Sequence, residues 1–493
     1  MNKNEYKDIA KSNFVYGGVK IIQVLVLIFK TKIVAVLLGP SGVGILSLLN
    51  TTVTTIFQFT NLGISQSSVR DISIESDSEE KKKIAKTVNY LAIFLGIISS
   101  ILCFIFSQVI SNLVFGKLDY SFAFKIVAVS LFFQSVSSAQ VSILQGLRMV
   151  VVLSKASLIG AIASLLLSIP LFYFWKIESI PYAIVLGYFI TSLIYYIYRK
   201  KKYSLSILID NVSFKTRTKS IIGLGVTLMV GNGIMAVFNL GLNTFINRFG
   251  SEVEVGYYQA ASMCSYSAIN ILISILASDY YPRMASVIED SKKSTEVLNA
   301  QIALLLLVLS PVVCFMIVFP TFFIHLLYSS EFILISGAVQ IMSISLFFRI
   351  IWHCFSYIIL AKGDKKMYLY IDAILGNGLF FIGNIIGFYF MKVDGIAISF
   401  VVISCLVMTI LYILVSFKYH IKLEVFTIKL ASFLFIICLV IYLFNILFDE
   451  SLFKLYTNIF VSCIVFVFCC KQIDEKTGIF SVIAQKIKLW KKE

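Results

Sequence analysis

About fourteen long apolar stretches, separated by short polar segments, limit the fold of this chain more than any other feature of its sequence. Each is roughly 17–25 residues long, which is the length that an α-helix needs to cross the hydrocarbon core of a bilayer. In lipid, a helix also satisfies its own backbone hydrogen bonds. The sequence therefore predicts an all-α polytopic membrane protein, with spans near 13–37, 42–69, 87–110, 122–147, 156–175, 180–198, 221–246, 256–280, 298–319, 332–360, 368–391, 395–417, 428–447 and 456–470.

The composition agrees with a membrane protein and argues against nucleic acid as a partner. Only 14% of the 493 residues are charged, against about 25% in an ordinary soluble protein. Most of the 42 Lys and Arg residues lie in the two termini and in every second loop. By the positive-inside rule this bias predicts that both termini are cytoplasmic. The net charge of +16 then reflects the excess of basic residues on the cytoplasmic side of the membrane.

Short sequence landmarks recur in the two halves of the chain at a nearly constant offset. The segment FYFWKIESI (172–180) returns as FYFMKVDGI (388–396), and LLGPSGVG (37–44) returns as RFGSEVEVG (248–256). A third pair is ILQGLR (143–148) and ILAKGDK (359–365). Each half holds six spans, an even number, so both halves enter the membrane the same way round. This pattern predicts two six-helix bundles related by a parallel pseudo-twofold axis, with a binding site between them.

The predicted organisation follows from the repeat and from a basic segment at its midpoint. Two further spans and a basic, amphipathic cytoplasmic tail come after the repeated halves. The expected parts are an N-terminal six-helix bundle (1–198), a basic cytoplasmic linker (199–220), a C-terminal six-helix bundle (221–417), two peripheral transmembrane helices (418–470) and the tail (471–493).

Basic residues inside the spans are the first candidates for a functional site. The first span carries Lys20, Lys30 and Lys32, and the tenth carries Arg349 near its middle. A charge at the centre of a membrane helix costs roughly 3 kcal/mol on insertion scales, so such residues usually face protein or a water-filled cavity. We interpret these four residues as candidates for the cavity cations that bind substrate. Lys30 and Lys32 are about 200° apart around the helix, so they cannot both face the cavity, and the sequence leaves open which one does.

Polar residues at helical spacing predict a polar lining for the same cavity. For any single side chain the alternative is a hydrogen bond between helices, and both interpretations stay open here. The candidate lining residues are Asn50, Gln58, Asn61, Gln134, Asn239, Asn243, Gln259, Asn270 and His353. Asp279 and Asp372, near the ends of their spans, are candidates for ion coupling.

The sequence contains no pattern typical of a catalytic, metal or cofactor site. The three histidines lie on different elements, and there is no phosphate-binding loop of the GxxxxGK[ST] type. The nine cysteines lie almost wholly inside apolar stretches, and none forms a CxxC pair. We therefore predict a protein that is not an enzyme and has no metal or cofactor. Energy would come from an ion gradient, the membrane potential or removal of the product.

Six short segments stand in a fixed order along the chain: KIVAVLLGPSGVG (32–44), VGYYQAA (255–261), DYYPRM (279–284), RIIW (349–352), ILAKGDKK (359–366) and VDGIA (393–397). In these segments and their order the chain resembles Wzx-type polysaccharide flippases of the MOP (multidrug/oligosaccharidyl-lipid/polysaccharide) superfamily. The resemblance implies a V-shaped pair of six-helix bundles. It also implies that Lys32 and Arg349 stand where the family has basic residues that engage a lipid-linked diphosphate.

The function implied by this resemblance is the translocation of an undecaprenyl-diphosphate-linked oligosaccharide, such as an O-antigen repeat unit. Its direction would be from the cytoplasmic to the periplasmic leaflet of a bacterial inner membrane, by alternating access. Implied partners are the lipid-linked substrate, membrane lipid, a polysaccharide polymerase and a chain-length regulator. Two alternatives stay open: a multidrug or cation antiporter of the same superfamily, and a membrane polysaccharide polymerase. The sugar unit, the coupling ion and the oligomeric state are not set by the sequence.

Overall fold

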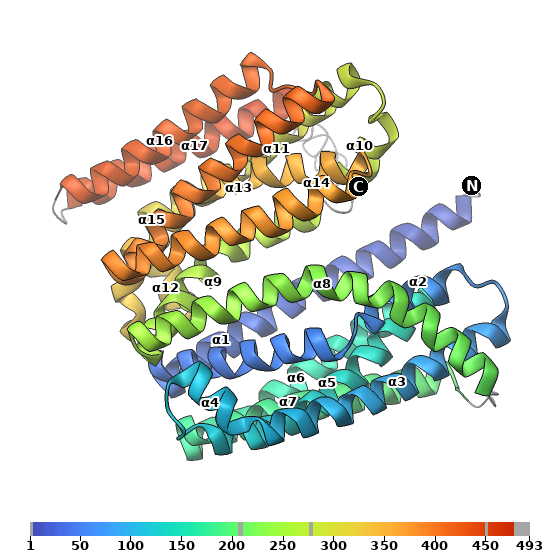
Figure 1. Cartoon of the computed structure of the whole chain (residues 1–493). Helices are drawn as coiled ribbons and strands as arrows, with labels where there is room; N and C mark the ends of the chain where they lie inside the picture. The colour runs from blue at the N-terminus through green and yellow to red at the C-terminus, as the bar shows by residue number, and fades with distance from the viewer. Residues whose placement is uncertain (1–2, 206–210, 276–279, 449–451, 478–493) are drawn as a thin grey trace, which may run out of the picture. The chain divides into compact units, whose positions relative to one another are not determined.

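A computed structural model describes residues 3–205, 211–275, 280–448 and 452–477. Within these ranges the chain is almost entirely helical and has no β-strand (Figure 1). Its contacts divide it into two compact units. Unit 1 consists of Met1–Gly256 with Leu326–Glu331, and unit 2 consists of Tyr257–His325 with Phe332–Glu493.

Unit 1 is built from long apolar helices that pack side by side. Its elements are α1 (Lys3–Thr60), α2 (Ile64–Ile74), α3 (Ser78–Ile105), α4 (Ser107–Phe115), α5 (Ser121–Gly146), α6 (Val150–Trp175), the 3₁₀ segment η1 (Lys176–Ser179), α7 (Ile180–Lys202) and α8 (Asn211–Phe249), followed by the start of α9 (Glu252–Ile275). One apolar core cluster, which includes Ile72, Val88 and Ile143, joins α2, α3 and α5. Helix α3 begins where the Asp77 side chain accepts a hydrogen bond from the backbone N–H of Glu79, a typical N-cap.

Helix α1 contains a sharp turn that separates two of the expected spans. Gly39 has φ 63° and ψ −171°, and Pro40 follows it. A positive φ is readily adopted by glycine, and proline can begin a new helix because it needs no donor there. The chain therefore reverses at this point, and Figure 1 shows the two arms of α1 running back along each other. The expected boundary between the spans 13–37 and 42–69 is confirmed.

Unit 2 packs most of its helices around α11 and α13. Its elements are the rest of α9, α10 (Tyr281–Val287), α11 (Ser291–Val318), α12 (Pro320–Leu327), the 3₁₀ segment η3 (Ser330–Ile335), α13 (Ser336–Ala361), α14 (Lys365–Met367), the π-helical segment η4 (Tyr368–Gly376), α15 (Asn377–Tyr419), α16 (Val425–Leu447) and α17 (Leu452–Thr477). In α11, 67% of the most apolar stretch is buried, so this helix forms the centre of the unit. Asp290 caps its start by accepting hydrogen bonds from the backbone of Lys292 and Lys293.

The sequence repeat is also visible in the backbone. Lys176 has φ 44° and ψ −127°, and Lys392, its counterpart 216 positions later in the printed sequence, has φ 53° and ψ −134°. A non-glycine residue in this region is rare and strained. The preceding Phe172 and Phe388 are both buried. Two segments that share this uncommon turn, at matched positions in different units, support the internal repeat.

A second pair of repeat landmarks meets directly inside unit 1. A Cβ atom added to Gly44 would lie 1.7 Å from the carbonyl oxygen of Glu252, and one added to Gly256 would lie 2.0 Å from the carbonyl oxygen of Pro40. Each glycine therefore faces the carbonyl that lies four residues before the other glycine. Such reciprocity is the property of a contact on a local twofold axis. It agrees with the predicted parallel relation between the repeats.

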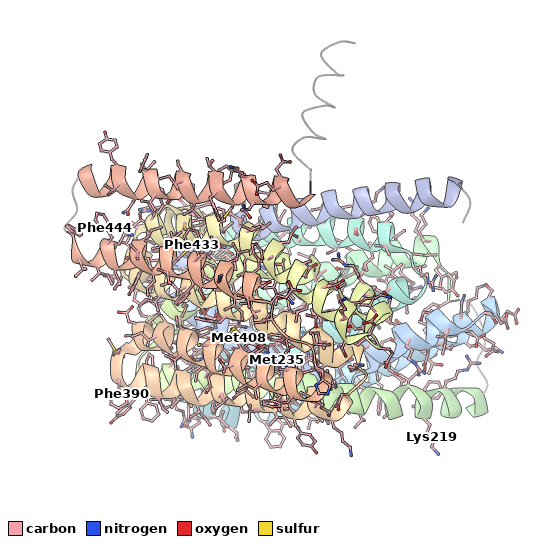
Figure 2. All side chains as sticks on the ribbon, turned by 90° about the horizontal axis from the view of Figure 1, so that it is seen from above. Lys219, Met235, Phe390, Met408, Phe433 and Phe444 are labelled. Carbon is pink, nitrogen blue, oxygen red and sulfur yellow. The ribbon has the colours of Figure 1, made fainter. Side chains whose placement is uncertain are left out.

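The outer surfaces of the helices are apolar, as expected for a protein in lipid. Large side chains such as Phe390, Tyr389 and Phe417 are more than two thirds exposed. Figure 2 shows Phe390 projecting outward at one edge, while the labelled Lys219 projects at another. Exposed apolar area on this scale marks a surface covered by another apolar phase. The chain is therefore a multi-pass membrane protein.

Ten helical stretches of the described residues are long and apolar enough to cross a membrane. They overlap all the expected spans except 256–280, which corresponds to α9. Two of them, 150–202 and 368–419, each hold two expected spans. The turns at Lys176 and Lys392 separate these spans.

The division into compact units differs from the expected division into repeated halves. Helix α8, the first span of the second half, belongs to unit 1, where it packs against α1 and α2. Polar contacts hold it there: Asn243 donates to Thr51 at 3.2 Å, and Asn232 donates to Gln66 at 3.2 Å. The expected bundles at 1–198 and 221–417 describe the repeat, and they stay a prediction.

Candidate functional site

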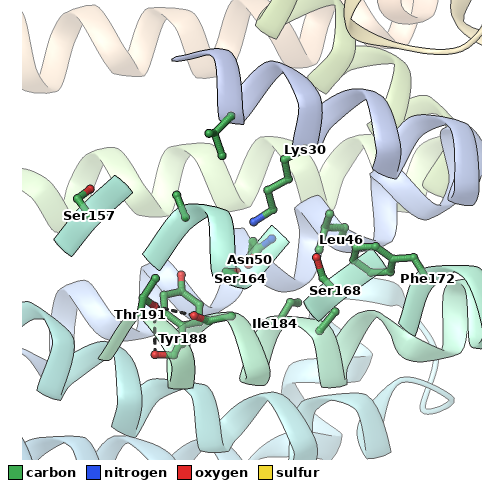
Figure 3. A pocket seen from close by; sticks show the side chains of 14 residues that line it. Lys30, Leu46, Asn50, Ser157, Ser164, Ser168, Phe172, Ile184, Tyr188 and Thr191 are labelled. Carbon is green, nitrogen blue, oxygen red and sulfur yellow. Dashed lines mark hydrogen bonds between the residues drawn. The ribbon is translucent and has the colours of Figure 1, made fainter. Parts of the chain in front are cut away.

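Lys30 lies in a pocket of about 490 Å³ inside unit 1. Both arms of α1 form one side, and α6 and α7 form the other. Figure 3 shows the Lys30 side chain pointing into the pocket, toward Asn50 and Ser164. Pockets that bind small molecules are typically about 300–1,000 Å³. The volume is therefore sufficient for a small polar ligand.

The lining of this pocket combines one cation with many hydroxyl groups. Its polar side chains are Lys30, Asn50, Ser157, Ser164, Ser168, Tyr188 and Thr191, and its remaining walls are apolar. Neither Asp nor Glu is present among the fourteen described residues that line it. Thr191 donates to the Gly187 carbonyl at 2.6 Å, and Ser168 donates to the Leu165 carbonyl at 2.9 Å. Because these protons are used within the helices, the two hydroxyl oxygens can act as acceptors.

Lys32 points elsewhere. Its ammonium group donates a hydrogen bond to the backbone carbonyl of Tyr328, which belongs to the short segment of unit 1 that follows α12. Of the two lysines that the sequence could not distinguish, Lys30 therefore lines the pocket and Lys32 contacts a carbonyl outside it.

Arg349 lies half-buried in unit 2 and is surrounded by aromatic rings. Its guanidinium carbon is 4.4 Å from the ring centre of Tyr266, 5.0 Å from Phe380, 5.5 Å from Trp352 and 5.9 Å from Phe400. One terminal nitrogen donates to the Tyr266 hydroxyl at 3.2 Å. Arginine stacks on aromatic faces through its planar, weakly hydrated cation. The rings fix its position without neutralising its charge, and no described carboxylate pairs with it.

His353 lies one turn after Arg349 on α13, as its spacing predicts. Its ring stacks on Trp352, with the centroids 5.6 Å apart and the planes 3° apart. Its Nε2 atom and the Nε atom of Arg349 are both buried without a hydrogen-bond partner among the described atoms. Buried polar groups are rarely left unpaired. These two nitrogen atoms therefore mark a place in unit 2 where a polar ligand would gain hydrogen bonds.

Two of the predicted lining residues instead connect helices. Asn61 donates to the Ser65 hydroxyl at 2.5 Å, and Ser138 of α5 donates to the same hydroxyl at 2.7 Å. Asn243 is fully buried and donates to Thr51 of α1. These contacts match the alternative that polar residues join helices across a membrane interface.

The other predicted residues are distributed over both units. Asn50 lines the Lys30 pocket. Gln58 and Gln259 are half-buried, Asn239 is exposed, and Gln134 has a buried side-chain oxygen without a partner among the described atoms. Asp279 and the side chains of Lys20, Asn270 and Asp372 lie outside the described residues. The two ion-coupling candidates therefore stay predictions.

The hydroxyl groups that α6 and α7 contribute to the pocket were not among the residues predicted from the sequence. Ser157, Ser164 and Ser168 are seven and four residues apart, which places them on one face of a helix. This spacing was the signal that could have identified them. Tyr188 and Thr191 are three residues apart on the facing helix. They become part of the site because α6 packs against α7.

A buried arginine was also missed, because its position in a basic segment suggested a solvated loop. Arg199, near the end of α7, is only 4% exposed. Its Nε donates to Gln140 at 2.7 Å, and Gln140 donates to Asn89 at 2.8 Å. This network ties α7 to α5 and α3, and it contributes to the structure of unit 1.

Comparisons with known proteins agree on one fold. The sequence matches the family described as polysaccharide biosynthesis protein over residues 33–337. No curated protein sequence matches the chain significantly. The structure is similar to that of the lipid II flippase MurJ in an inward closed conformation, with 17% identity, a TM-score of 0.69, and coverage of 94% of this chain and 99% of that one.

Two transporters of the MOP superfamily are also similar in structure. One is a multidrug resistance MATE family transporter in an inward-facing conformation, with 15% identity, a TM-score of 0.65, and coverage of 85% of this chain and 98% of that one. The other comes from Pyrococcus furiosus and is described by the reversed polarity of its binding pocket. It has 16% identity, a TM-score of 0.57, and coverage of 82% of this chain and 93% of that one.

Proposed function

The chain belongs to the polysaccharide biosynthesis protein family, and from this premise we propose that it is a flippase for a lipid-linked oligosaccharide. Its substrate would be an O-antigen or similar repeat unit joined to undecaprenyl diphosphate. The protein would carry this unit from the cytoplasmic to the periplasmic leaflet of a bacterial inner membrane. It would act as a transporter and not as an enzyme.

The observation that carries this proposal is the environment of Arg349. A cation held within a membrane protein, as the half-buried Arg349 is, is normally paired with an opposite charge. Here aromatic rings hold the guanidinium group, and no described carboxylate neutralises it. A cation that is held in place but left unneutralised favours an anionic ligand. A diphosphate supplies oxygen acceptors that match the geometry of a guanidinium group.

The physical problem of transport explains why such a site is needed. A diphosphate and its sugars cannot cross hydrocarbon unaided, because each charge would lose its hydration. The isoprenoid tail can stay in lipid while the headgroup follows a polar route through the protein. We propose that Arg349 and Lys30 are two positions on that route, and that the repeated halves expose it alternately to each side.

The main rival is a multidrug exporter of the same superfamily. Cationic drugs require carboxylates in their binding site, because opposite charges provide the attraction. The described lining of the Lys30 pocket and the described surroundings of Arg349 contain none. The charges of both positions therefore favour an anionic substrate.

The remaining sequence-based expectations form part of the same proposal. Both termini would be cytoplasmic, and a polysaccharide polymerase and a chain-length regulator would act on the exported unit. Asp279 and Asp372 would be tested separately as ion-coupling residues.

The test is the substitution Arg349→Ala in cells that depend on this protein for surface polysaccharide. We expect the variant to be inserted at normal abundance, while surface polysaccharide is lost and the lipid-linked oligosaccharide accumulates. The matched control is Arg70→Ala, because the Arg70 side chain is 63% exposed and its nearest carboxylate, Asp71, is 3.8 Å away. Normal surface polysaccharide in the Arg349→Ala cells would refute the proposal. Cells that lack the gene provide the test of the exporter. If they become drug-sensitive, and the restored gene returns drug resistance without any effect on polysaccharide, the exporter is supported instead.

A further inference from the structure

We infer that the Lys30 pocket of unit 1 binds a sugar ring that carries a single acidic group. This inference rests on the proposed function and specifies the chemistry of the headgroup that the pocket selects. It assigns the pocket to the saccharide part of the substrate and not to its diphosphate.

The hydroxyl content of the pocket fits a saccharide. Besides Lys30, six polar side chains line it: Asn50, Ser157, Ser164, Ser168, Tyr188 and Thr191. Hydroxyl and amide groups both donate and accept hydrogen bonds, as sugar hydroxyls do. At least two of these oxygens, in Ser168 and Thr191, have their protons committed to backbone carbonyls. Each can therefore accept a hydrogen bond from a sugar hydroxyl.

The apolar walls fit the same ligand. Phe172 and Tyr188 bring aromatic rings to the pocket, and Leu46 and Ile184 bring aliphatic groups. A sugar ring has apolar C–H faces as well as polar edges, so it needs both kinds of wall. A phosphate group has no apolar face and would gain nothing from these side chains.

The charge of the pocket separates an acidic sugar from a diphosphate. Lys30 supplies a single positive charge, and no other ionised side chain is present among the described lining residues. One carboxylate would neutralise this charge. A diphosphate would leave negative charge uncompensated inside a membrane-spanning unit, where it is costly. The Lys30 side chain is partly exposed, and a neutral sugar would offer its ammonium group only uncharged acceptors, which bind it less strongly than a carboxylate does.

The experiment compares two synthetic undecaprenyl-diphosphate disaccharides that differ in one group. One ends in glucuronate and the other in glucose, and the full-length protein is reconstituted with each of them in proteoliposomes. Transport is measured as the fraction of the lipid that is modified by a glycan-modifying reagent, which cannot cross the membrane. The variants are Lys30→Gln, Thr191→Val and Lys125→Gln. The last is the control, because Lys125 is a lysine inside a helix of unit 1 that lies outside the pocket, 5.9 Å from the Phe104 ring.

We expect the wild-type protein and Lys125→Gln to prefer the glucuronate lipid. Lys30→Gln should lose roughly ten- to hundredfold in transport of that lipid and leave the glucose lipid nearly unchanged, because it removes one charge-assisted hydrogen bond. Thr191→Val should reduce transport of both lipids by a few-fold, because it removes one neutral hydrogen bond. If the wild type transports both lipids, an equal rate for the two would overturn the inference. A preference that survives in Lys30→Gln would do the same.

A binding measurement distinguishes this inference from the proposed function. The full-length protein in nanodiscs is titrated with glucuronate, glucose and inorganic pyrophosphate, and binding is followed by saturation-transfer NMR. Binding of glucuronate that weakens in Lys30→Gln supports the pocket assignment, even if neither lipid is transported and the proposed function fails. Binding of pyrophosphate that depends on Lys30, without binding of glucuronate, overturns it.

Discussion

The reciprocal contact of Gly44 and Gly256 allows a stability prediction with a defined magnitude. In Gly44→Ala the new Cβ atom would lie 1.7 Å from the Glu252 carbonyl oxygen, and Cβ contacts under 3.0 Å are essentially not found in proteins. The second arm of α1 must therefore move from α9 by the difference, about 1.3 Å. Overfilling a packed site costs about 1–3 kcal/mol, and the obstacle here is backbone, which cannot rotate away.

Alanine also favours the helical state over glycine by about 1 kcal/mol. Taking the upper value for the steric cost, the net destabilisation of Gly44→Ala is about 2 kcal/mol. This loss should lower the thermal unfolding midpoint by a few degrees. The assay is thermal unfolding of the purified protein in detergent micelles.

The control for this prediction is Gly231→Ala on α8. A Cβ atom at Gly231 meets nothing within 4 Å, so this variant should be as stable as the wild type or slightly more stable. The double variant Gly44→Ala/Gly256→Ala should cost less than the sum of the single variants, because one separation relieves both clashes. Equal midpoints for Gly44→Ala and Gly231→Ala would refute the reasoning. If the destabilisation of the double variant equals the sum of the two single destabilisations, the two glycines do not share one contact.

Three further predictions concern the turns, one helix contact and one ion pair. Lys392→Gly should stabilise the protein by about 1 kcal/mol, because glycine adopts the positive φ of this position without strain; an unchanged or lower unfolding midpoint would contradict this. Asn243→Ala should destabilise by about 1 kcal/mol, because it removes the buried hydrogen bond to Thr51; chemical denaturation measures it, and no change would show that the contact is not formed. The hydrogen bond from Lys418, with the backbone N–H of Met367, lowers the pKa of Asp364 from 3.8 to about 2. The stabilisation by this carboxylate is therefore complete above the unfolded-state pKa and is lost as the pH falls through about 2. The difference in unfolding midpoint between wild type and Asp364→Asn should be constant from pH 5 to pH 8, and a difference that shrinks within this range would refute it.

The membrane spans could be predicted because lipid leaves few alternatives to a helix. An apolar stretch of the right length must satisfy its backbone internally, and Gly39 with Pro40 then sets where the first two spans separate. The landmark around Lys392 could also be placed, since a matching segment precedes it. The assignment of α8 to unit 1 could not be predicted. It depends on partners such as Thr51, which is almost two hundred residues away in sequence.

The sequence pointed to the cations of the candidate site as candidates, but it did not identify the groups that contact them. Helical periodicity showed that Lys30 and Lys32 face different directions, but the choice between them depended on the Tyr328 carbonyl, 296 residues from Lys32. The aromatic rings around Arg349 come from α9, α13 and α15. Of these only Trp352 is a helical neighbour in the sequence. Local spacing predicts which face of a helix is polar, and the packing of distant helices decides what that face meets.

The contact between Gly44 and Gly256 also bears on how such a chain could originate. If a half-length ancestor paired with a second copy of itself, a single glycine would have met its own duplicate across the dimer axis. Any side chain introduced there would have appeared twice and clashed twice. Joining the two copies into one polypeptide ended that constraint, because each position could then vary alone. In the fused chain, one of the two glycines can therefore be substituted alone, and its effect on the free energy of unfolding can be measured. In a homodimer, every substitution changes both copies of the residue.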